Sequence, residues 1–166
     1  IVWQIDKSSG YNGEDEMVTK LWDGINYEGT NIRNIHPVQG GSTLVDSTMY
    51  LMSNKNFAIE NDSIFLMKID GTTSNNDIEL KVELLHSDIN YGIAPNALQE
   101  SDDSLATNDS RVLGAFIENN EIQFVSNSIN FETGKPAVYH GVIKDALNPE
   151  IKAHIIFFHL FLIRKK

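Results

Sequence analysis

The stretch that decides the fold of this chain reads Val112-Leu-Gly-Ala-Phe-Ile-Glu-Asn-Asn-Glu-Ile-Gln-Phe-Val-Ser126. It consists of two apolar runs on either side of the pair Asn119-Asn120. Asparagine tolerates the backbone angles that tight turns require, so the stretch predicts a β-hairpin that turns at this pair.

A similar phrase occurs earlier in the chain. The segment Ile59-Glu-Asn-Asp-Ser-Ile64 corresponds to Ile117-Glu-Asn-Asn-Glu-Ile122 at an offset of 58 residues (117 − 59). Ile35-His-Pro37 corresponds to Ile93-Ala-Pro95 at the same offset (93 − 35). We therefore expect two repeat units, approximately residues 35–92 and 93–150, each with strands joined by a turn.

The rest of the chain also favours strands. Ile78, Leu80, Val82 and Leu84 alternate with charged residues, which predicts a strand with one solvated face. No segment keeps the spacing of an amphipathic helix for more than about two turns, so the sequence predicts an all-β fold of antiparallel meanders. We expect core positions for Trp3 and Trp22, a loop at 6–16, strands at 57–59 and 64–69 around a turn at Asn61-Asp62, and surface loops at 88–109 and 127–136.

Repeats of about 40 to 60 residues that each contain several antiparallel strands are typical of β-propeller blades. Units of 58 residues give this chain fewer than three blades, whereas a closed propeller needs at least about four. The two architectures that remain are a partial propeller, as part of a longer protein, and an open stack of sheets.

The composition bounds the class of partner. The chain has 166 residues, 13 Lys and Arg against 23 Asp and Glu, and a formal net charge of −10. Nucleic-acid binding depends on clustered basic residues, so we expect no nucleic-acid partner. The chain has no cysteine, which excludes disulfides and thiolate metal sites.

The C-terminal region differs from the rest. Residues 155–163 form an almost unbroken apolar run that Arg164-Lys-Lys166 follows. This run is shorter than the about 20 residues of a membrane-spanning helix, so we expect no transmembrane span. A buried strand, an artefactual tail on a truncated chain and a membrane-surface anchor are the three interpretations. We place the boundary between the repeat region, residues 1–152, and this tail, residues 153–166.

Four phrases carry a resemblance to a known family: Tyr91-Gly-Ile-Ala-Pro-Asn-Ala-Leu-Gln99, Thr107-Asn-Asp-Ser-Arg-Val-Leu-Gly-Ala-Phe116, Ile122-Gln-Phe-Val-Ser-Asn127 and Ala137-Val-Tyr-His-Gly141. The region from Ile35 to Ile143 resembles the propeller-like repeats of large secreted or surface proteins of Bacteroidetes, many of which carry a C-terminal secretion-sorting domain. The resemblance implies an exported all-β scaffold at the cell surface. It brings no catalytic residues with it.

The sequence contains few chemical motifs. The five histidines are scattered without zinc-binding spacing, and the chain has neither a Gly-x-Ser-x-Gly elbow nor a phosphate-binding glycine loop. The favoured interpretation is a non-catalytic scaffold or a platform for carbohydrate or protein ligands. The alternative is a fragment of a glycan-degrading enzyme, which requires two carboxylates on one face. Glu60 and Glu118 recur in both units but flank turns, which favours a structural role.

Calcium is the cofactor that the loops suggest, because hard cations prefer several oxygen ligands. The candidate ligands are Asp6, Asp70, Asp77 and Asp109, each within an oxygen-rich stretch. None of them fits the EF-hand register. In the stretch that begins at Asp6, for example, Tyr11 stands at position six, where an EF-hand loop requires glycine. Turn formation by the same Asp and Asn residues is the simpler interpretation.

Calcium-stabilised loops make a direct prediction. If these aspartates hold calcium, a chelator such as EGTA lowers the melting temperature, because it removes a ligand that binds only the folded state. Differential scanning calorimetry with and without chelator measures this. An unchanged melting temperature would exclude calcium as a stabilising ligand.

Overall fold

A computed structural model describes residues 1–40, 47–71, 73, 78–99 and 103–156. Strands dominate it, which confirms the all-β class. The elements are β1 (Val2–Ile5), α1 (Lys7–Tyr11), β2 (Thr19–Trp22), β3 (Asn26–Tyr27), β4 (Thr30–Asn31), β5 (His36–Pro37), β6 (Gln39–Gly40), β7 (Met49–Asn54), β8 (Asn61–Ile69), β9 (Leu80–Tyr91), β10 (Ala97–Leu98), β11 (Ser104–Leu105), β12 (Val112–Glu118), β13 (Glu121–Asn130), β14 (Lys135–Ile143) and β15 (Ile151–Ile156).

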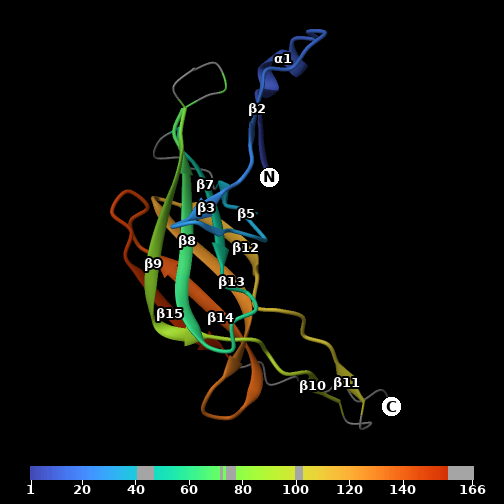
Figure 1. Ribbon diagram of the computed structural model, residues 1–166, viewed down its shortest axis with the longest axis vertical. Coiled ribbons are helices and arrows are strands. Elements are labelled where there is room, and N and C mark those ends of the chain that lie inside the picture. The colour runs from blue at the N-terminus through green and yellow to red at the C-terminus, as the bar shows by residue number, and fades with distance from the viewer. Residues whose placement is uncertain (41–46, 72, 74–77, 100–102, 157–166) are drawn as a thin grey trace.

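Two sheets form the body of the protein. The first sheet has the strand order β5-β7-β8-β9 and is antiparallel throughout. The second sheet has the order β15-β14-β13-β12-β6, in which only β6 runs parallel to its neighbour. Figure 1 shows β8 and β9 in front of β13 and β14, with the β1–β2 hairpin and α1 projecting from the body. The segment 36–40 joins the sheets, because β5 pairs with β7 and β6 with β12.

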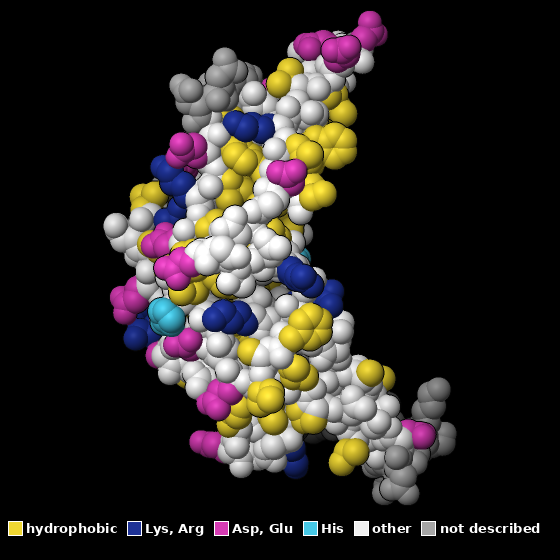
Figure 2. All heavy atoms as spheres, viewed as in Figure 1, with side chains coloured by type: hydrophobic (Ala, Val, Ile, Leu, Met, Phe, Trp, Pro, Cys, Tyr) yellow, Lys and Arg dark blue, Asp and Glu magenta, His cyan; other side chains and the backbone are white. Residues whose placement is uncertain are grey.

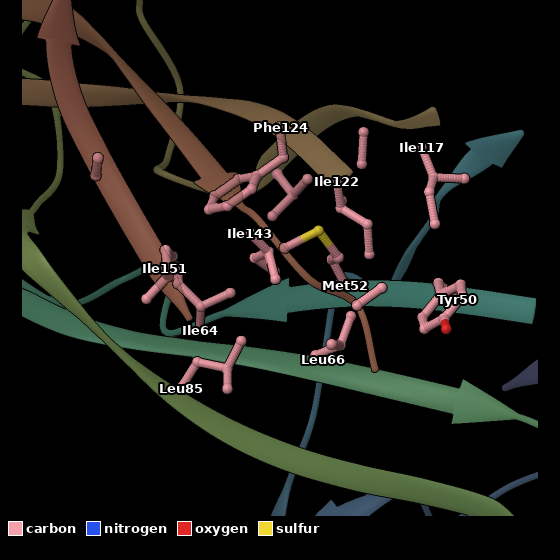
Figure 3. Packing of buried hydrophobic residues seen from close by; sticks show 14 of the residues in the cluster. Tyr50, Met52, Ile64, Leu66, Leu85, Ile117, Ile122, Phe124, Ile143 and Ile151 are labelled. Atoms are coloured by element: carbon pink, nitrogen blue, oxygen red, sulfur yellow. The ribbon is translucent and has the colours of Figure 1, made fainter. Parts of the chain in front are cut away.

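The main core lies between the two sheets. Side chains from β7 and β8 meet side chains from β13 and β14, as Figure 3 shows for Met52, Ile64, Ile122 and Phe124. Strand alternation places every second residue on this inner face. The fully buried hydrophobic members of the core cluster, each at 1% exposure or less, are Met52, Ile64, Leu66, Tyr91, Ile122, Phe124, Tyr139, Ile143, Ala146 and Ala153.

The N-terminal segment covers the outer face of the first sheet. Phe65, Met67 and Ile69 of β8 project to that face and pack into a second cluster with residues from the first 35 positions. Lys20 of β2 holds the N-terminal segment in place, because its Nζ donates a hydrogen bond to the carbonyl oxygen of Ile78 at 2.8 Å. Figure 2 shows hydrophobic side chains along the projecting arm and acidic side chains at its tip.

The predicted hairpin is confirmed. Strands β12 and β13 pair antiparallel, with Ile117 opposite Ile122 and Glu118 opposite Glu121. Asn119 and Asn120 form the turn with φ angles of 49° and 65°. Both central residues are therefore left-handed, which is the geometry that a two-residue hairpin with the right-handed strand twist requires.

The earlier copy of the phrase folds differently. Ile59 is 84% exposed in a loop, whereas its counterpart Ile117 is buried. Strand β8 begins at Asn61, so the predicted strand at 57–59 and the predicted turn at Asn61-Asp62 are wrong. The β7–β8 connection spans 55–60, and longer loops need no pair of left-handed residues at their centre.

Other expectations are also corrected. Trp3 is 63% exposed on the β1–β2 hairpin, and only Trp22 packs into a hydrophobic cluster. The predicted loop at 6–16 contains the short helix α1, which Asp6 caps. Strand β9 runs on to the buried Tyr91, and β13 runs on to Asn130, so the loops predicted from 88 and from 127 begin later than expected.

The two expected repeat units divide between the two sheets. Residues 35–92 supply all four strands of the first sheet, and 93–150 supply β12, β13 and β14 of the second. The strand order repeats but the spacing does not, because β12, β13 and β14 begin 63 (112 − 49), 60 (121 − 61) and 55 (135 − 80) residues after β7, β8 and β9. The described residues form no closed barrel or propeller. Strand β15 crosses the boundary expected at residue 153, and its Ala153 is buried.

One glycine in the core gives a stability prediction. A Cβ atom at Gly141 would overlap the ring of Phe124, which lies opposite it on β13. We expect Gly141→Ala to lower the free energy of unfolding by about 1–3 kcal/mol through overpacking. Urea denaturation measures the loss.

A matched control lies in the same sheet. A Cβ atom at Gly114 would meet Val125 at an ordinary 3.8 Å, so Gly114→Ala leaves stability nearly unchanged. In the double variant Phe124→Leu/Gly141→Ala the smaller leucine side chain replaces the ring. The loss of unfolding free energy caused by Gly141→Ala should therefore be smaller when it is measured in the Phe124→Leu background. Equal losses for the two glycine variants would contradict this account of the core.

Candidate functional site

Among the described residues, the calcium candidates Asp6, Asp70 and Asp109 are not brought together into a metal site. Within the described part of the chain, no group of three or more His, Asp or Glu side chains is placed to hold a metal ion. Asp6 caps helix α1 and accepts a hydrogen bond from the backbone N–H of Ser8 at 2.9 Å. Asp70 accepts one from the Thr48 hydroxyl at 2.7 Å. Asp77 lies outside the described residues.

Asp109, the fourth candidate, belongs to a buried polar network. Its carboxylate accepts hydrogen bonds from Nδ2 of Asn56 at 2.7 Å and from Nε and Nη2 of Arg111 at 2.7 and 2.6 Å. These hydrogen bonds, those from Arg111 first, hold the pKa of the Asp109 carboxyl below its usual value. The side chain therefore ties the β7–β8 loop to the segment before β12.

The hollow beside Phe131, which we call the Phe131 hollow, has the strongest features of a binding site. It has a volume of about 520 Å³, within the range of small-molecule pockets. Phe131 is 44% exposed there. Its lining combines one aromatic ring, two aliphatic side chains, three carboxylates and two amides: Phe131, Ile89, Ile155, Glu60, Asp88, Glu132, Asn90 and Asn130.

A tight turn holds Phe131 in place. The buried Asn130 side chain accepts hydrogen bonds from the backbone N–H of Thr133 at 2.8 Å and from its hydroxyl at 3.1 Å. The Gly134 N–H donates to the Asn130 carbonyl at 2.8 Å, and Gly134 has a φ of 67°. Behind the ring lies Gly92, where any Cβ atom would crowd both Phe131 and the carbonyl of Ile59.

The polar groups of the hollow are partly fixed in orientation. Nδ2 of Asn90 donates to Oε1 of Glu60 at 2.7 Å. Oδ1 of Asp88 accepts from the Ala153 N–H at 2.9 Å, and its Oδ2 lies 3.9 Å from Nζ of Lys152. Glu132 is exposed to solvent. The repeated pair Glu60 and Glu118 is not brought together here, because Glu118 lies beside the Asn119-Asn120 turn.

Sequence reasoning identified only Glu60 among these residues, and for a different reason. The members come from a loop, from β9, from the end of β13 and from β15, so no local spacing relates them. The one available signal was Phe131 itself, an aromatic residue within a polar stretch. An exposed ring within a mostly polar segment is a sign of a binding surface.

Comparisons with known proteins add no identification. No protein-family model, no curated protein and no solved structure matches the chain. Among the described residues, no helix has the length and apolar character that crossing a membrane requires.

The Asp109 network predicts acid sensitivity. An aspartate whose pKa is lowered by folding stabilises the protein above the unfolded value of about 3.9, and this contribution disappears as the pH falls through the folded pKa. We expect Asp109→Asn to cost about 1–3 kcal/mol at pH 7, since it leaves the buried Asn56 amide and the Arg111 guanidinium poorly matched. The difference from wild type should shrink below pH 4.

Urea denaturation at pH 7 and pH 3 tests this prediction. The matched control is Asp23→Asn, which changes an exposed aspartate outside the network and should leave stability within about 0.5 kcal/mol of wild type at both values. A cost for Asp109→Asn that stays constant between the two pH values would show that its charge contributes nothing.

Proposed function

We propose that the protein is a non-catalytic carbohydrate-binding module of an exported bacterial surface protein, and that the Phe131 hollow receives the sugar. The observation that carries the proposal is an exposed aromatic ring bordered by carboxylate and amide groups. A pyranose ring has the complementary chemistry, because it offers an apolar C–H face and a rim of hydroxyl groups.

The apolar part of the recognition rests on Phe131. Burial of apolar surface contributes about 25 cal/mol per Å², so stacking of one sugar face on the ring is a substantial share of a weak binding energy. The backbone at Phe131 needs little reorganisation, since the Asn130 turn already holds it, and Gly92 leaves room for the ring where any Cβ atom would crowd it. A ligand site fixed before binding loses less conformational entropy on binding.

The polar part rests on Glu60, Asn90 and Glu132. Carboxylate oxygens accept hydrogen bonds from sugar hydroxyls, and hydrogen bonds to charged groups are stronger than those between neutral groups. The Asn90–Glu60 hydrogen bond holds these two lining groups together. The set favours a neutral glycan over an acidic one, because the carboxylates would repel uronic or sialic acids.

A glycan-degrading enzyme is the second candidate, since three carboxylates line the same hollow. Hydrolysis requires a carboxylic acid whose pKa an apolar pocket raises, beside a second carboxylate. Glu60 and Glu132 are instead exposed, and Asp88 is engaged by the Ala153 backbone. This arrangement favours binding over catalysis. Turnover of a bound glycan that Glu60→Gln abolishes would reverse the preference.

The proposal includes export of the protein to the cell surface and its place within a larger propeller-like array of sheets. The resemblance to Bacteroidetes surface proteins supports export to the cell surface. The supply of β7, β8 and β9 by one stretch of the chain and of β12, β13 and β14 by the next supports successive blades of a larger propeller-like array. A structure of a longer natural chain tests the latter: further four-stranded sheets packed face to face would support it, and a body complete with two sheets would exclude it.

The variant Phe131→Ala tests the sugar site. We expect a bound glycan, identified on an array of neutral oligosaccharides, to lose roughly 10- to 100-fold in affinity because the stacking surface disappears. Asn90→Ala should weaken binding less, through the loss of one polar contact. Isothermal titration calorimetry with the array hit measures both losses.

The chain contains a matched aromatic control. Phe57 is 67% exposed in the β7–β8 loop and does not line the hollow, so Phe57→Ala should leave the affinity unchanged. Melting temperatures confirm that each variant is folded. Equal losses for the two phenylalanine variants, or no binding to any neutral glycan, would rule the site out.

A further inference from the structure

The outer face of the second sheet presents two histidines side by side. His140 on β14 lies directly opposite His154 on β15 in the antiparallel register. The inner face of the sheet carries their buried neighbours Tyr139, Gly141 and Ala153. Because side chains alternate between the two faces of a strand, both imidazoles lie on the outer face. Directly opposed residues of antiparallel strands have Cβ atoms about 4.5–5.5 Å apart.

A chain of hydrogen bonds fixes the ring of His140. Nε2 of Gln123 donates to Oε1 of Glu121 at 2.8 Å, which leaves the Gln123 amide oxygen directed at the imidazole. Nε2 of His140 lies 3.3 Å from this oxygen and therefore carries the proton in the neutral ring. The tautomer set in this way keeps the lone pair on Nδ1.

The remaining nitrogens have no competing partner. Within the described part of the chain, neither Nδ1 of His140 nor either ring nitrogen of His154 makes a hydrogen bond. Strand β14 lies between β13 and β15, so Gln123 and His154 flank His140 from opposite sides. This arrangement matches histidine metal ligands, which commonly donate their second N–H to an oxygen that orients the ring.

We propose that His140 and His154 together bind a divalent transition-metal ion at this face. Imidazole nitrogen suits zinc, copper and nickel, and each nitrogen lies about 2.0–2.1 Å from a bound zinc ion. Two protein ligands leave the other positions to water or to donors of a partner molecule. The site therefore holds metal in an open, exchangeable form, unlike a closed structural zinc site.

The chemistry separates this site from the calcium hypothesis. Calcium requires six to eight oxygen ligands, whereas the pair offers nitrogen, and the Glu121 carboxylate accepts a hydrogen bond from Gln123. Lys152 on the same strand as His154 forms ion pairs with Asp88 and Glu150, at 3.9 and 3.7 Å. The site is also distinct from the Phe131 hollow, whose lining contains neither histidine.

Titration calorimetry of the metal-free full chain, without a polyhistidine tag, at pH 7.5 tests the proposal. We expect one Zn²⁺ per chain, with tighter binding of Cu²⁺, as the usual order of divalent affinities requires. His140→Gln and His154→Gln should each weaken binding at least about tenfold. Gln123→Leu should weaken it by a similar factor through the loss of the orienting oxygen.

The matched control is His86→Gln, which removes an exposed histidine on β9 that pairs with Asp62 at 3.0 Å. Its affinity for Zn²⁺ should equal that of wild type. Copper should broaden the imidazole NMR signals of His140 and His154 before those of His86. No measurable binding of either ion, or equal weakening by all three histidine variants, would overturn the proposal. Neither result affects the sugar site, which needs no metal.

Discussion

The structure depends on the burial of two sheet faces against each other. A lone four- or five-stranded sheet with one apolar face exposes that face to water, and packing the two faces together removes both from solvent. Met52, Ile64 and Leu66 on one side and Ile122 and Phe124 on the other are fully or almost fully buried by this contact (Figure 3). The strands that carry the Phe131 hollow and the histidine pair belong to these two sheets.

Two buried tyrosine hydroxyls at this contact are satisfied by hydrogen bonds. The Tyr91 hydroxyl donates to the Ser63 carbonyl at 2.6 Å and accepts from the Lys55 N–H at 2.9 Å. The Tyr139 hydroxyl lies 2.6 Å from the Ser87 hydroxyl. Burial raises the pKa of both phenols, that of Tyr139 to about 12. The rings therefore stay neutral at physiological pH, and the Tyr139–Ser87 hydrogen bond links β14 of the second sheet to β9 of the first.

The same contact builds the Phe131 hollow. The Asn56–Asp109 hydrogen bond ties the loop before β8 to the segment before β12, and this loop ends at Glu60. The Gly92 carbonyl accepts from the Ser110 hydroxyl at 2.6 Å, and the Gly92 N–H donates to the Ser128 hydroxyl at 3.2 Å. Glu60 and Phe131 thus reach one place because hydrogen bonds between the sheets bring their loops together.

The sequence predicts those features of the structure that depend on neighbouring residues, and it does not predict those that depend on tertiary packing. The Asn119-Asn120 hairpin was predictable, because its turn and alternation are local properties. The phrase at Ile59–Ile64 has nearly the same letters but a different fold, because its surroundings and not its own propensity place Ile59 in solvent. The exposure of Trp3 likewise depends on which face of β1 packs on the body. Local pattern identified the hairpin strands β12 and β13 and the alternation of β9, whereas tertiary packing decided the ends and faces of the strands.

The histidine pair shows which part of a functional site local sequence pattern can predict and which part it cannot. Alternation along β14 and β15 places His140 and His154 on the outer face, and that much is readable from the apolar neighbours of each. Their adjacency depends on the register, which the connection at 144–150 fixes through the Lys144 N–H to Glu150 carbonyl bond at 3.2 Å. A slip of one residue would send one ring to the opposite face. A site made of residues from two strands can therefore be recognised only when the pairing register of the strands is known. The sequence specifies that register only through the packing of the whole sheet.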